Sequence, residues 1–117
     1  MPNPLCHFEF QTNDPEKCKA FYSKIFDWTF ETPPGHEDYT LIQTGEGPGG
    51  GMMKRPEQCP APMLGIYIQV DDIDETLAKV TEAGGNVVVP KMPIPNVGSM
   101  AVFVDPEGIG VGIFQPQ

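Results

Sequence analysis

The sequence predicts an α+β domain built from two copies of a βαβββ unit. Three observations support this fold class. Apolar and polar residues alternate near the start of the chain, as in a half-buried strand. A capped, amphipathic helix pattern follows that strand, and the same strand and helix order returns about 58 residues later. The chain has 117 residues, which is the length of a single domain.

The first strand is predicted over residues 5–12, where the side chains alternate between two faces. Phe8 and Phe10 fall on one face, which should pack in the core. The other face carries polar residues, namely His7, Glu9 and Gln11. If the strand curls around a cavity, this polar face lines it.

A helix is predicted next, over residues 14–27. Either Asn13 or Asp14 can cap its free N–H groups, and Pro15 suits the first turn. Three shorter strands follow, separated by proline and glycine residues. They are predicted at residues 28–30, 39–42 and 51–53.

The pattern restarts after a segment with three prolines, residues 56–62, which we interpret as a linker inside the domain. The first module then spans about residues 4–55 and the second about 63–117. A strand is predicted at residues 64–70. A helix at 72–83 begins with a capping-box pattern, Asp72 and Glu75, and ends before Gly84. The last three strands are predicted at residues 86–89, 100–104 and 111–114.

Superposing the halves supports a duplication. A shift of 58 residues places Glu9 on Tyr67, and a shift of 61 at the ends places Gly51 on Gly112. The alternative is two unrelated strand–helix segments. An ordered match of strand, cap, helix and Glu-Gly turn favours the duplication.

Several segments resemble the vicinal oxygen chelate superfamily, which includes glyoxalase I, extradiol dioxygenases and bleomycin-binding proteins. The first module carries three of them, residues 7–10 (HFEF), 14–22 (DPEKCKAFY) and 26–28 (FDW). The second carries residues 70–74 (VDDID), 83–85 (AGG) and 103–108 (FVDPEG). The resemblance implies paired modules whose mixed sheet curls around an open cleft, with the helices outside.

The resemblance also implies a divalent metal that chelates adjacent oxygens of the substrate. The family's ligand positions fall on His7, Gly51, Gly65 and Gly112 in this sequence. Glycine has no side chain to coordinate a metal, and a catalytic site needs about three protein ligands. We therefore expect no metal cofactor. A site made by His7, Glu9 and a third ligand from a partner subunit stays open, and His36 lies in a predicted loop.

We expect six residues to line the cleft and bind a small organic ligand. They are His7, Glu9, Met53, Tyr67, Gln69 and Phe114. Two function classes remain open. One is a metal-free binding protein, like the bleomycin-binding branch. The other is a metal-dependent lyase or dioxygenase of the glyoxalase type, so whether the protein is an enzyme is left undecided.

The amino-acid composition limits the kinds of partner that the protein can bind. The net charge is −9, and the seven Lys and Arg residues do not cluster, which argues against binding nucleic acid or an anionic membrane. The sequence shows neither a signal peptide nor a long apolar run, so a cytoplasmic location is expected. Three cysteines at wide spacing predict reduced thiols, either buried or catalytic. Exposed strand edges favour a homodimer.

Overall fold

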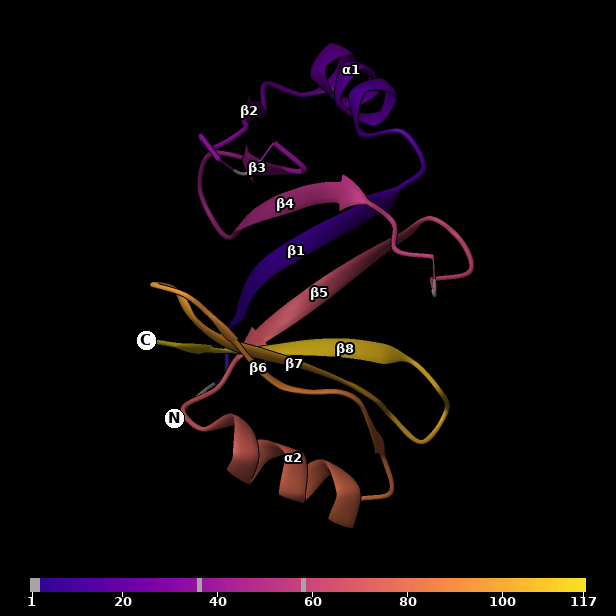
Figure 1. Ribbon diagram of the computed structural model, residues 1–117, viewed down its shortest axis with the longest axis vertical. Helices are drawn as coiled ribbons and strands as arrows, with labels where there is room; N and C mark the ends of the chain where they lie inside the picture. Colours follow the sequence, from indigo (N-terminus) through magenta and orange to yellow (C-terminus); the bar gives the residue numbers. More distant parts are fainter. Residues whose placement is uncertain (1–2, 36, 58) are drawn as a thin grey trace. The chain divides into compact units, whose positions relative to one another are not determined.

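The computed structural model describes residues 3–35, 37–57 and 59–117. Within these ranges the chain forms ten elements, drawn in Figure 1. The first module contains β1 (Leu5–Thr12), α1 (Pro15–Ile25), β2 (Thr29–Glu31), β3 (Tyr39–Gln43) and β4 (Gly49–Lys54). The second contains β5 (Met63–Gln69), α2 (Ile73–Glu82), β6 (Asn86–Ile94), β7 (Gly98–Val104) and β8 (Gly110–Pro116). The predicted α+β fold with two βαβββ modules is confirmed.

The strands of the first module lie in the order β2-β3-β4-β1. β1 pairs with β4 in parallel, whereas β3 pairs antiparallel with both β2 and β4. The second module repeats this arrangement in the order β5-β8-β7-β6, with a parallel β5–β8 pair and two antiparallel pairs. Each module therefore contains a mixed set of strands, as predicted.

Local chemistry starts both helices in the same way. The Asp14 carboxylate accepts a hydrogen bond from the Lys17 N–H at 3.2 Å, and Asp72 accepts one from the Glu75 N–H at 3.1 Å. Asp14, rather than Asn13, is thus the cap of α1. α2 ends at the predicted place, because Gly84 adopts a φ of 100° that other residues rarely reach.

The helix-facing side of the first module is aromatic. The Phe10 ring lies 5.1 Å from that of Tyr22 on α1, and the Phe8 ring lies 6.1 Å from that of Trp28. Trp28 was predicted to open a strand, but β2 begins one residue later. The Trp28 ring instead stacks on Phe26 at 5.0 Å and on Tyr22 at 5.6 Å. The predicted facing of Phe8 and Phe10 is confirmed.

The second module has its own core. Val70, Ile73, Ala101 and Ile113 are buried together, and Ile73 and Ala101 are fully enclosed. Ile113 therefore faces the α2 side, and the next positions along β8 face the other way. Figure 1 shows α2 lying alongside β6, β7 and β8, consistent with its packing against those strands.

Between the modules' strands, β4 ends at Lys54 and β5 begins at Met63, so the segment predicted as a linker carries no regular element among its described residues. His36, predicted in a loop, lies outside the described residues. None of the helices in the described ranges is long and apolar enough to cross a membrane.

Candidate functional site

Three polar side chains of the first module meet on the strand face opposite α1. The Tyr39 hydroxyl on β3 donates a hydrogen bond to Glu9 Oε1 on β1 at 2.9 Å. The hydroxyl oxygen of Tyr39 also lies 3.1 Å from His7 Nε2. Because a hydroxyl carries a single proton, the oxygen of Tyr39 accepts from the His7 N–H. We call His7, Tyr39 and Glu9 the polar triad.

Glu9 is the charged centre of the polar triad. Its side chain is 15% exposed, and His7 Nε2 lies 3.8 Å from its carboxylate. Burial acts to raise the pKa of Glu9, but hydrogen bonds from His7, Tyr39 and Gln11 and the charge of His7 outweigh it. The pKa of Glu9 consequently lies below its ordinary value, and the carboxylate is ionised at neutral pH.

Gly51 provides the space for this arrangement. Gly51 on β4 is the register partner of Glu9, and a β-carbon at position 51 would overlap the ring and hydroxyl of Tyr39. Tyr39 pairs with Met53, which lies two residues after Gly51 on β4. Its side chain therefore extends diagonally across the strand pair to Gly51. The family's ligand position at the end of the first module is therefore filled by the tyrosine side chain.

The second module repeats this relationship with a different tyrosine. Gly112 on β8 is the register partner of Tyr67 on β5, as Gly51 is of Glu9. A β-carbon at Gly112 would lie 2.5 Å from two ring carbons of Tyr67. The matching registers agree with the predicted alignment of Gly51 with Gly112, and in each module a tyrosine covers the glycine.

The six residues predicted to line a cleft fall into two groups. His7, Glu9 and Met53 belong to the first module, where Gln11 pairs with Met53. Tyr67, Gln69 and Phe114 belong to the second, where Gln69 pairs with Phe114. Strand alternation and register place the members of each group on one strand face of their own module. That both groups line one cleft stays a prediction.

Sequence reasoning missed Tyr39. The strand containing it was predicted, but its side chain was not assigned to the site. The signal lay in the alternation of β3, because Thr40 and Ile42 are buried and Tyr39 must then point to the opposite face. The opposing Gly51, which leaves room for a large neighbour, was the second signal.

The possible metal donors of the described residues are few. In the described part of the chain, no three side chains of His, Cys, Asp or Glu gather closely enough to hold a metal ion. His7 and Glu9 are two donors, but both are engaged by Tyr39, and Gly51 contributes none. The described residues of the first module therefore do not fit the metal centre that the family resemblance implies.

The cysteines do not contribute to the polar triad. Cys6, Cys18 and Cys59 are free and partly buried. Burial raises the pKa of the Cys6 and Cys18 thiols above its ordinary value. A raised pKa favours the thiol over the nucleophilic thiolate, which disfavours a catalytic role for these two residues.

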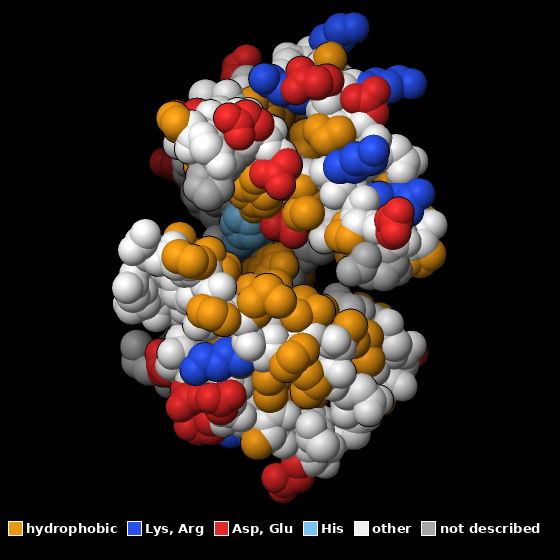
Figure 2. Space-filling model, viewed as in Figure 1, with side chains coloured by type: hydrophobic (Ala, Val, Ile, Leu, Met, Phe, Trp, Pro, Cys, Tyr) orange, Lys and Arg blue, Asp and Glu red, His pale blue; other side chains and the backbone are white. Residues whose placement is uncertain are grey.

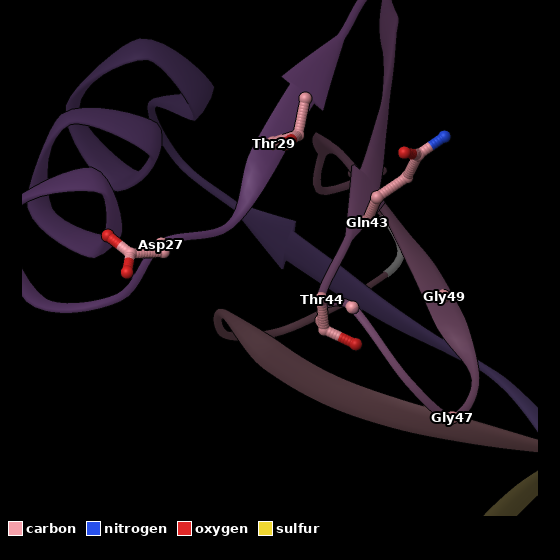
Figure 3. A pocket seen from close by; sticks show the side chains of 7 residues that line it. Asp27, Thr29, Gln43, Thr44, Gly47 and Gly49 are labelled. Atoms are coloured by element: carbon pink, nitrogen blue, oxygen red, sulfur yellow. The ribbon is translucent and has the colours of Figure 1, made fainter.

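A hollow of about 300 Å³ lies where β3 turns into β4, and one of its lining residues, Gly49, is the register partner of His7. Its walls are polar side chains and glycine backbone: Asp27, Thr29, Gln43, Thr44, Gly45, Gly47 and Gly49. Figure 3 shows that the side chains of Asp27 and Gln43 point away from each other. These two side chains therefore do not converge on one ligand, and none of the predicted site residues lines the hollow.

Comparison with known proteins agrees with the duplicated fold. Residues 5–113 match the family described as Glyoxalase/Bleomycin resistance protein/Dioxygenase superfamily. The chain belongs to this superfamily. The resemblance inferred from the short motifs is thus confirmed over nearly the whole sequence.

Individual relatives cover this chain to different extents. A glyoxylase-like domain-containing protein of Didymella fabae is 32% identical over 107 residues, which is 86% of this chain and 84% of the relative. Protein CFP32 of Mycobacterium bovis is 31% identical over 113 residues, 92% of this chain, but the chain spans only 43% of CFP32. Methylmalonyl-CoA epimerase from Mycobacterium tuberculosis superposes with a TM-score of 0.72 at 11% identity, covering 97% of this chain and 87% of the epimerase. The last similarity shows the fold alone.

Proposed function

We propose that this protein binds a small organic molecule at the polar triad and lacks a complete catalytic metal site. One observation carries the proposal. The hydroxyl of Tyr39 occupies the space in front of Gly51 and ties together His7 and Glu9. His7, which lies at a ligand position of the metal-dependent family members, is here hydrogen-bonded to Tyr39.

The surroundings of the polar triad also suit a ligand. Its residues are partly buried, so their polar atoms are shielded from water without being sealed off. Met53 and Leu41 alternate with the core residues Met52 and Ile42 and supply apolar surface on the triad's face. A few placed polar groups beside apolar surface are typical of small-molecule sites.

The alternative is a metal-dependent lyase or dioxygenase of the glyoxalase type. The similarity to a protein of Didymella fabae that is named glyoxylase-like supports this alternative. It requires a third donor beside His7 and Glu9, because catalytic metal sites use about three protein ligands. The two classes therefore differ in metal content and in the role of His7.

The test begins with protein purified without chelator and then dialysed against zinc, iron, nickel or manganese. We expect far less than one metal per chain by mass spectrometry. A library of small organic molecules is then screened by thermal shift. His7→Ala should abolish the shifts given by hits, whereas Thr44→Ala, a control outside the polar triad, should keep them. Stoichiometric metal that is lost on His7→Ala would establish the alternative.

A further inference from the structure

We propose that the polar triad selects an organic cation, such as a protonated amine, over neutral and anionic molecules of the same shape. This inference rests on the proposed function and specifies its ligand class. It starts from the direction of each hydrogen bond in the polar triad. Tyr39 directs its proton to Glu9, so the polar triad presents the Glu9 carboxylate, rather than a hydroxyl proton, to a ligand.

The Glu9 carboxylate retains capacity to accept. Its Oε1 atom takes the Tyr39 hydroxyl at 2.9 Å, while Oε2 has only a long contact of 3.5 Å from the Gln11 amide. A hydrogen bond of that length is weak. An ammonium group carries three donors and a positive charge, and it therefore matches Oε2 better than a hydroxyl does.

No fixed cation competes for this carboxylate among the described residues. The lysine ion pairs in the described ranges, Lys79–Glu75 and Lys91–Asp74, both belong to the second module. In those ranges the basic side chain within 4.0 Å of Glu9 is the imidazole of His7, at 3.8 Å. A dication in a metal-dependent site attracts electron-rich oxygens, whereas an ionised carboxylate without a metal ion attracts cations and repels anions.

The charge of the whole chain acts in the same direction. Sixteen Asp and Glu residues against seven Lys and Arg give a net charge of −9. Such a field raises the local concentration of cations and lowers that of anions. Because this effect is spread over the chain, the test must separate it from the contribution of Glu9.

The experiment compares three probes that share one ring system: naphthylmethylammonium, naphthylmethanol and naphthylacetate. Binding to the full chain is followed by NMR from the amide shifts of residues 7–11, near neutral pH and at moderate salt. We expect the ammonium probe to bind at least about tenfold more tightly than naphthylacetate, with naphthylmethanol between them.

Two variants show whether the preference for the ammonium probe comes from Glu9 or from the charge of the whole chain. Glu9→Gln keeps the size of the side chain and an oxygen that can accept from Tyr39, and it should reduce the preference to less than about twofold. Glu31→Gln removes an equal charge from exposed β2 and should leave the preference unchanged. Equal loss in both variants would assign the preference to the general field and overturn the proposal.

Other results also decide the matter. Tighter binding of naphthylmethanol or naphthylacetate would overturn the cation preference but leave small-molecule binding intact. If none of the three probes shifts residues 7–11 at millimolar concentration, the cation site is rejected. The library screen with the His7→Ala variant would then judge the proposed function separately.

Discussion

The Tyr39 side chain fills the space that a β-carbon at Gly51 would occupy. The two residues lie on adjacent antiparallel strands, two positions apart in register, so the contact is diagonal across the pair. Any side chain at position 51 must displace the hydroxyl that joins His7 to Glu9. Gly51 is thus a positioning residue for the polar triad.

The first prediction is that Gly51→Ala destabilises the protein by about 1–3 kcal/mol, because the added methyl group overpacks against Tyr39. Urea unfolding measures the loss. The matched control is Gly110→Ala, since a β-carbon at Gly110 meets no atom within 4 Å and its backbone needs no positive φ. Equal stability of the two variants would show that Tyr39 does not occupy this space.

A double variant sharpens the first prediction. Tyr39→Ala removes the group that Gly51→Ala strikes, so the two substitutions should not be additive. Gly51→Ala should cost less in the Tyr39→Ala background than in the wild type. Additive losses of stability would show that Gly51→Ala does not act through a clash with Tyr39.

Much of the fold could be predicted because alternation and caps are local. The first strand was predicted at its observed bounds, and Asp72 caps α2 as its position indicated. The predictions were too short where pairing overrides pattern. β4 begins at Gly49, and β6 continues through Pro90 to Ile94, although glycine and proline disfavour strands.

The candidate site could be predicted only in part, since alternation identifies a face but not the partners across strands. His7 and Glu9 were assigned to one face from a single strand. The role of Tyr39 depends on the register of β3 with β4 and on the missing side chain at Gly51. That information is long-range, so local patterns do not contain it.

The second prediction concerns the helix caps. Asp72→Ala removes the acceptor of the Glu75 N–H and should reduce the free energy of unfolding by about 0.5–2 kcal/mol. Asp71→Ala, which removes the neighbouring exposed carboxylate, is the control and should have little effect. Thermal unfolding of both variants distinguishes a capping effect from a general charge effect.

The third prediction is that the protein forms a homodimer. Large apolar side chains remain exposed, including Phe21 at 57% and Val88 at 56%, and Figure 2 shows hydrophobic side chains gathered on the drawn face of the second module. The register shifts of β6 and its prolines blunt that edge, so we expect side-chain faces rather than strand edges to pair. Sedimentation at tens of micromolar should give twice the chain mass, and a monomer at all concentrations would contradict the prediction.

The fourth prediction is that Tyr39→Phe raises the pKa of Glu9, because it removes one of the hydrogen bonds that stabilise the ionised carboxylate. Carbon-detected NMR of the Glu9 carboxyl measures the change. The control is Tyr22→Phe, which removes a hydroxyl from the helix-facing side of the module and should leave the Glu9 titration unchanged. The lost hydrogen bond should also cost about 1–2 kcal/mol of stability at neutral pH.

The sign of the pH dependence follows from the same shift. Glu9 has a lower pKa in the folded protein than in the unfolded chain, so the unfolded state binds protons first as the pH falls. Its contribution to stability is complete above the unfolded pKa and disappears as the pH drops through the folded pKa. Tyr39→Phe brings the two pKa values closer and should therefore flatten the acid limb of the stability curve. An acid limb as steep as that of the wild type, with the Glu9 titration unmoved, would show that the Tyr39 hydroxyl does not stabilise the carboxylate.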